Sequence, residues 1–157
     1  MQKNIIVLAI AGLMLFGCEK TETFNGLSDS IPANAVTVSN AADFRPAPTV
    51  KASLADRKIQ IVLTIAGGRQ IKEITRVSAS TTYTQVQGTT GLYSSTPIPG
   101  NGNTVTFNTT IDEYKTKTAT TADPAVNTEL ARRFYFLLTL DDGSQVIPSD
   151  VRVLIVP

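Results

Sequence analysis

The fold is decided by the stretch FYFLLTLDDGSQVIPSDVRVLIV, residues 134–156. Apolar residues fill both alternating positions of 134–140, a pattern typical of a strand that is buried on both faces. The turn DDGS at 141–144 supplies a glycine, which adopts positive φ at little cost. Residues 151–156 then alternate and are rich in β-branched side chains. The stretch therefore predicts a hairpin between a central strand and the last strand of the domain.

Further strands are expected upstream of this hairpin. Residues 58–66 show period-two alternation, the signature of a half-buried strand. Residues 71–80 are a β-branched run with broken alternation, which favours a strand with a bulge. Residues 104–111 alternate again, and 81–102 are expected to hold short edge strands and loops. Residues 112–129 are polar and irregular, with a single helical turn expected at 112–115 or 124–130.

Short strands separated by turn signals, without a long amphipathic helix, predict an all-β fold, an antiparallel β-sandwich. We expect this domain to span residues 50–157. Residues 18–49 are rich in Ser, Asn, Ala and Pro and are expected to form a polar tether, within which Val36 and Val38 can form a short first strand. Residues 1–17 have the basic start and apolar core of a secretory signal, and that core is too short for a transmembrane helix.

The signal ends in Leu15-Phe16-Gly17-Cys18, and Cys18 is the only cysteine in the chain. This tetrapeptide resembles the lipobox of bacterial lipoproteins, although Phe16 is bulkier than the usual residue at its position. The resemblance implies cleavage before Cys18 and a lipid on its sulfur. Two or three acyl chains anchor a protein stably. The alternatives are an ordinary cleaved signal with an incidental cysteine, or a short membrane anchor.

Two short motifs in the tether resemble features of Bacteroidota lipoproteins. Glu19-Lys20-Thr21-Glu22 resembles their surface-export signal, and a solvated linker explains the same residues equally well. Asp29-Ser30-Ile31 resembles their O-glycosylation acceptor, which would make Ser30 a modified residue, while a plain polar linker is favoured. The resemblances imply an outer-membrane lipoprotein that faces the cell surface or the periplasm.

The segment from Phe134 to Val156 resembles the last two strands of an immunoglobulin-like or fibronectin type III domain. Pro148-Ser149 before the last strand belongs to that resemblance, and Leu130 with Tyr135 resembles the tyrosine corner of that fold. The early-strand tryptophan and the intersheet disulfide of the fold are missing. Related small lipoproteins often serve in surface assemblies for glycan capture or adhesion, and this function is implied by analogy alone.

Composition excludes several kinds of chemistry. The chain has no histidine and no tryptophan, and its one cysteine is the expected lipid acceptor, so the common zinc and copper ligand sets and Ser-His or Cys-His nucleophile pairs cannot form. We expect no enzyme, no metal and no cofactor. The net charge is +1, from 14 basic and 13 acidic residues, which gives no electrostatic footprint for nucleic acid.

The remaining candidate sites are few. Tyr83, Tyr93 and Tyr114 lie in loop-rich segments and are candidates for glycan or partner contacts, with packing under loops as the favoured alternative. Asp141-Asp142 could supply half of a calcium site with Asp150 or Asp123, although a hairpin turn explains the pair better. Asp112-Glu113 are adjacent, so on a strand they would point to opposite faces, and an exposed loop is expected there.

The expected function is that of a membrane-anchored, non-enzymatic lipoprotein, a protein-interaction or structural module of the cell envelope. Its partners would be the membrane, through Cys18, and an envelope protein. The alternative is a surface glycan-binding or adhesion domain in a polysaccharide-uptake system. Tyr83, Tyr93 and Tyr114 carry that alternative.

Overall fold

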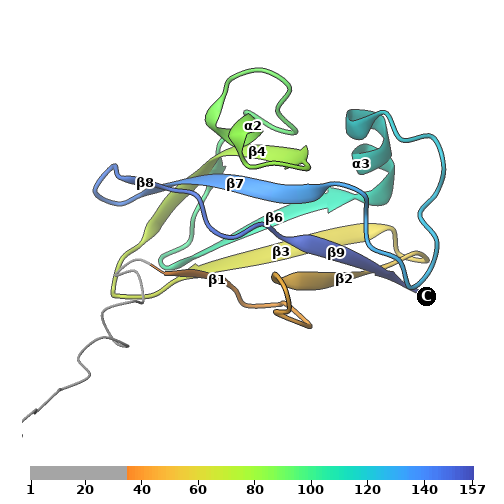
Figure 1. Cartoon of the computed structure of the whole chain (residues 1–157). Helices are drawn as coiled ribbons and strands as arrows, with labels where there is room; N and C mark the ends of the chain where they lie inside the picture. Colours follow the sequence, from red (N-terminus) through yellow and green to blue (C-terminus); the bar gives the residue numbers. More distant parts are fainter. Residues whose placement is uncertain (1–34) are drawn as a thin grey trace, which may run out of the picture. The chain divides into compact units, whose positions relative to one another are not determined.

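The computed structural model describes residues 35–157, so the predicted signal, Cys18 and Ser30 lie outside the described residues. Within the described part, nine strands and two short helices follow one another along the chain (Figure 1). Their bounds are β1 Val36–Val38, β2 Thr49–Ser53, β3 Lys58–Ile65, β4 Ile71–Ser80, α2 Thr84–Gln87, β5 Ile98–Pro99, β6 Thr104–Thr110, α3 Ile111–Thr118, β7 Arg133–Leu140, β8 Gln145–Val146 and β9 Arg152–Val156. The predicted all-β sandwich is confirmed.

The strands form two antiparallel sheets and a parallel pair. One sheet has the order β1-β3-β6, and the other has the order β5-β4-β7-β8. The first strand of the pair, β2, runs parallel to the last strand, β9. An antiparallel bridge between Phe134 and Val151 links the start of β7 to the residue before β9. A hairpin is therefore present between β7 and β8. The last strand, β9, was predicted to be its second strand, but β9 pairs with β2 instead.

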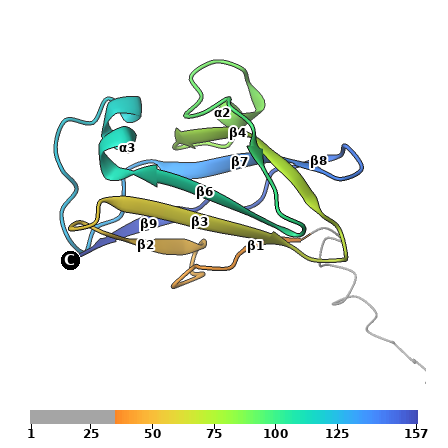
Figure 2. The same ribbon diagram turned by 180° about the vertical axis from the view of Figure 1, so that it is seen from behind.

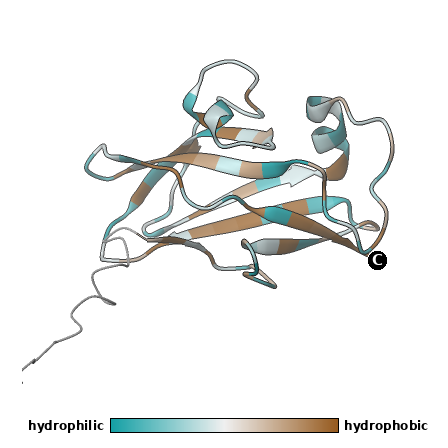
Figure 3. Ribbon diagram, in the orientation of Figure 1, coloured by the Kyte–Doolittle hydropathy of each residue, from teal (hydrophilic) through white to brown (hydrophobic). Residues whose placement is uncertain are grey.

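The period-two pattern predicted for residues 58–66 is confirmed in β3. Ile59, Ile61, Leu63 and Ile65 of β3 are all buried, while Lys58 and other alternate residues face outward. Figure 3 shows the apolar residues gathered on β3, β7 and β9. Burial of one such large aliphatic side chain contributes about 1.5–3 kcal/mol. The inward faces of the two sheets together form the main core.

The prediction that residues 134–140 are buried on both faces is confirmed. In β7, which lies between β4 and β8, Phe134 and Phe136 face the main core. On the opposite face, Tyr135 and Leu137 form a second, smaller cluster with Val86 of α2. The segment containing α2 lies over this sheet in Figure 1. Because this segment covers the outer face of β7, the apolar side chains on that face are shielded from solvent.

The predicted irregularity in β4 is also present. Its pairing with β7 shifts register between Ile71 and Glu73 and again between Ile74 and Arg76. Next to the first shift, Gly100 approaches so closely that a Cβ on it would lie 1.8 Å from the backbone oxygen of Ile71. Only glycine fits at position 100 without moving the backbone. This residue therefore allows the segment between β5 and β6 to pass close to the start of β4.

Several expected boundaries are wrong. The short first strand expected at Val36 and Val38 is present as β1. Because β1 pairs with β3 and Thr49 already belongs to β2, the paired strands begin before residue 50. The helix at 111–118 has two turns rather than one, since the hydroxyl of Thr110 caps it by accepting from the Glu113 N–H, and it places Asp112-Glu113 on a helix rather than a loop. No helix forms at 124–130, and α2 was not expected.

Tyr135 does not act as a tyrosine corner. Its hydroxyl donates to the distant carbonyl of Thr81 at 3.4 Å. The entry to β7 is instead held by Tyr114 of α3, whose hydroxyl oxygen accepts from the Arg132 N–H at 2.8 Å. A tyrosine fixes the start of this strand, as the resemblance implied, but it comes from the preceding helix.

Candidate functional site

The edge strand β6 is the first feature with a free hydrogen-bonding surface. Its register with β3 runs from Lys58 opposite Thr110 to Thr64 opposite Thr104. Bonds from the Ile65 N–H to the Asn103 carbonyl and from the Ile111 N–H to the Arg57 carbonyl extend this ladder at both ends. Because antiparallel ladders alternate, residues 103, 105, 107, 109 and 111 direct their backbone groups toward β3. Residues 104, 106, 108 and 110 direct theirs away from it.

Part of this outward row is unpaired. The backbone groups of Thr104 bond to Asn101 in the preceding turn, which agrees with the alternation. For Thr106 and Asn108, and for the N–H of Thr110, residues 35–157 supply no backbone partner. Figure 2 shows β6 beside β3, with α3 continuing from its end. An edge strand with free N–H and C=O groups is a template for another strand.

The side chains do not protect this edge. Natural edge strands are commonly blocked by lysine, proline or an inward-pointing charge. The sequence of β6, TVTFNTT, contains none of these. Its exposed residue Asn108 is uncharged and accepts from the Gln60 amide at 3.2 Å. The edge is therefore polar enough to be hydrated and free of charges that would repel a partner strand.

A hollow of about 590 Å³ lies next to this edge. Its lining comes from the facing ends of β3 and β6 and from the first turn of α3, and it consists of Lys58, Ile59, Gln60, Asn108, Thr109, Thr110 and Glu113. Among its charged groups, Glu113 is paired with Lys117 at 2.8 Å. Lys58 has no ion-pair partner within the described residues. Within the part of the chain that the structure describes, the hollow thus presents amides, hydroxyls and the unpaired ammonium group of Lys58. We call β6 with this hollow the β6 edge site.

On the core side of β6, Tyr93 packs between the two sheets of the sandwich. Its ring packs against Phe134 at 5.3 Å between centroids and against Phe107 at 6.0 Å. Its hydroxyl lies 2.5 Å from that of Thr109, which in turn donates to Glu113. Lys117 lies 4.5 Å above the ring and donates to the Tyr93 carbonyl. These contacts hold the core-facing side chains of Phe107 and Thr109, and they do not use the backbone groups of Thr106 and Asn108.

Burial gives Tyr93 a pH dependence that can be measured. Desolvation raises the pKa of Tyr93 to about 12, against the opposing hydrogen bond with Thr109. The neutral phenol is therefore favoured by folding, so its contribution to stability is complete below pH 10 and is lost between pH 10 and 12. We expect the urea-unfolding free energy to fall over this range, and to fall less in Tyr93→Phe. An equal fall in both proteins would contradict this assignment.

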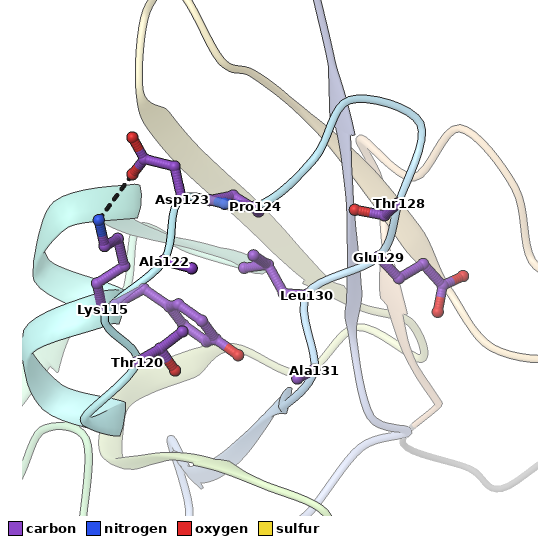
Figure 4. Close-up of a pocket in the computed structure, with 10 residues that line it drawn as sticks. Lys115, Thr120, Ala122, Asp123, Pro124, Thr128, Glu129, Leu130 and Ala131 are labelled. Carbon is purple, nitrogen blue, oxygen red and sulfur yellow. Dashed lines mark hydrogen bonds and ion pairs between the residues drawn. The ribbon is translucent and has the colours of Figure 1, made fainter.

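A second hollow, of about 180 Å³, lies between α3 and the segment 120–131 (Figure 4). Lys115 donates to Asp123 at its rim at 2.8 Å, as the figure shows. Arg57 also contacts Asp123, at 3.0 Å, and bonds twice to Asp112. These hydrogen bonds hold the pKa of both carboxyls below the usual range. The charges of Arg57, Lys115, Asp112 and Asp123 are satisfied by one another, so the arrangement fastens the segment 120–131 to the domain.

Two of the three candidate tyrosines are not surface residues. Tyr93 is 5% exposed and Tyr114 is 2% exposed, and both belong to the main core. Their burial agrees with the favoured alternative, packing under loops, and does not support a glycan or partner contact by either ring. Tyr83, next to α2, is 55% exposed and stays a candidate.

The acidic residues that were considered as calcium ligands form ion pairs and turn hydrogen bonds instead. Asp141 and Asp142 both contact Arg69, at 2.8 Å and 2.5 Å, and Asp142 also accepts from Ser144 in the turn. Asp123 and Asp150 lie in other ion pairs. Within residues 35–157, no group of three or more acidic or cysteine side chains converges on a point where a metal ion could bind.

Comparisons with protein-family models, with curated proteins and with solved structures found no match to this chain. No helix among residues 35–157 is both long and apolar enough to cross a membrane. The β6 edge site was missed from the sequence, because the residues of β6 do not mark it as an edge strand. The run TVTFNTT has strand character without a charge or a proline, which is unusual for an edge.

Proposed function

We propose that this chain is a membrane-anchored, non-enzymatic lipoprotein that binds a protein partner of the cell envelope. The observation that supports a protein partner is the unpaired, uncharged backbone row of β6 beside a hollow. Strand addition to an exposed sheet edge is a common mode of peptide recognition. Main-chain bonds supply affinity there, and side-chain hollows supply specificity.

The strand order supports an immunoglobulin-like or fibronectin type III-like arrangement. If β3 and β6 are taken as the second and fifth strands of that fold, their pairing fits one of its sheets. The other sheet then has β4, β7 and β8 in the expected succession, while β9, which follows β8 in the chain, pairs with β2. Domains of this class carry many unrelated functions, so the function has to be argued from the edge site.

The non-enzymatic part of the proposal has two supports. The chain lacks histidine and has one cysteine, the proposed lipid acceptor. Three acidic groups, Asp112, Asp123 and Asp142, form ion pairs with Arg57, Lys115 and Arg69. General acid–base catalysis is most efficient when the pKa of the group lies near the working pH, and the pKa of each of these carboxyls is lowered, away from neutrality.

The anchor at Cys18 is tested by fractionation and capture of the tagged full chain. We expect the wild-type protein in the outer-membrane fraction and Cys18→Ala in the soluble fraction, because acyl chains supply the membrane affinity. Capture from detergent-solubilised membranes should recover one stoichiometric envelope protein. Protease treatment of intact cells separates a surface-facing domain from a periplasmic one. Membrane retention of Cys18→Ala, or recovery of the bait alone, would contradict the proposal.

The alternative, surface glycan binding, is supported by the exposed ring of Tyr83. Aromatic rings can stack on sugars. Titration calorimetry with host and plant polysaccharides distinguishes the two functions. Saturable binding by the wild type that is lost in Tyr83→Ala would favour the glycan function over a protein partner.

A further inference from the structure

We propose that the partner binds as an extended strand along β6 and places a carboxylate over Lys58. This inference rests on the proposed function and specifies its partner. It makes the partner a segment of another polypeptide, with an aspartate or glutamate beside Thr110. The supports are the direction of the β6 backbone groups and the charges of the hollow.

The backbone pattern selects a strand as the occupant. Thr106 and Asn108 each direct both an N–H and a C=O outward, two residues apart. Another extended chain offers the matching alternation at the same spacing. A polysaccharide has no such alternation of donors and acceptors. The free row is short, so backbone bonds alone would give weak binding and side-chain contacts have to contribute.

The charges of the hollow indicate which side chain the partner strand carries next to Lys58. In the β3–β6 register Lys58 lies opposite Thr110, so a strand added to β6 would have a residue about two strand spacings, roughly 10 Å, from Lys58. A lysine and an acidic side chain can meet across that separation above Thr110. Glu113, the other charged residue of the hollow, is occupied by Lys117 and Thr109. A carboxylate is therefore the group that complements the hollow.

A second copy of this chain fits less well. Two β6 strands paired with each other would satisfy the backbone rows, and no charge on β6 would oppose it. However, β6 contains no acidic residue, so Lys58 of each copy would keep its charge uncompensated. The observations thus favour a different polypeptide, and self-association becomes an outcome of the test.

The test uses the captured complex of the full chain and a carbodiimide, which joins a lysine amine directly to a carboxylate. We expect a cross-linked peptide that contains Lys58 and an acidic residue of the partner. Lys58→Arg should keep the partner and lose the cross-link, because its guanidinium retains the charge without the reactive amine. Lys58→Glu should lower partner retention at least tenfold, with Lys51→Glu as the control. Lys51 is an exposed residue of β2 outside the hollow.

Each outcome separates the two proposals. Equal retention by Lys58→Glu and Lys51→Glu, or a captured partner without a Lys58 cross-link, overturns this inference and leaves the proposed function standing. A cross-link from Lys58 to a second copy of this chain also overturns it. Failure to capture any partner with the wild type overturns the proposed function and this inference with it.

Discussion

Phe134→Ala is expected to lower the free energy of unfolding by about 3–5 kcal/mol, the range for removing a buried phenylalanine. Phe134 is fully buried at the start of β7. Its ring packs against Tyr93, Phe107 and Tyr114 at centroid distances of 5.3, 5.5 and 5.9 Å. Aromatic pairs of this kind add about 0.5–1.5 kcal/mol beyond their burial. Truncation would leave a cavity shared by both sheets and α3.

Urea denaturation of the domain measures this loss. Phe44→Ala is the matched control, because Phe44 is 57% exposed and its removal should change the free energy by less than about 0.5 kcal/mol. Should Phe134→Ala be too unstable to purify, Phe134→Leu keeps more of the packing and is expected to fall between the two. Similar stabilities for the Phe134 and Phe44 variants would contradict the assigned core.

Thr106→Pro is expected to abolish partner capture while leaving the fold intact. Proline removes the outward N–H of Thr106 and places a ring where a partner strand would pair. The ladder with β3 does not use this N–H, and proline is tolerated in edge strands where the N–H faces solvent. The variant should therefore unfold at nearly the wild-type urea concentration and recover no partner from solubilised membranes.

Thr106→Ala is the control for this experiment, since it removes the same hydroxyl but keeps the backbone N–H. We expect it to retain the partner nearly as well as the wild type. If Thr106→Pro retained the partner, the binding surface would lie elsewhere on the domain. If Thr106→Ala also lost it, the threonine side chain rather than the backbone would be the contact.

The sequence predicted those strands whose pattern of apolar and polar residues alone indicates which side chains are buried. The alternation in 58–65 and the two apolar faces of 134–140 both reappear in the structure, and so does the irregularity of 71–80. Period-two patterning predicts these elements because side chains of a strand alternate between faces. The sequence could not show that α2 covers the outer face of β7, since that contact joins segments far apart in the chain.

The candidate site was hardly predictable, because an edge is a property of strand order. Nothing in TVTFNTT states that β6 pairs on one side only, and the sheet order β1-β3-β6 supplies that fact. For Tyr93 and Tyr114 the loop-rich sequence left open a choice between ligand contact and packing under loops, with packing favoured. Both rings turn inward and pack against Phe134, a contact between segments far apart in the chain.

The central claim is that the outward backbone row of β6 is free in the isolated protein and paired in the complex. Amide hydrogen exchange, followed by NMR with and without the captured partner, tests it directly. We predict fast exchange of the Thr106 and Asn108 amides in the free domain and slow exchange in the complex, with Phe107 slow in both because it bonds to β3. Slow exchange of Thr106 and Asn108 in the free protein, or unchanged fast exchange in the complex, would contradict the account.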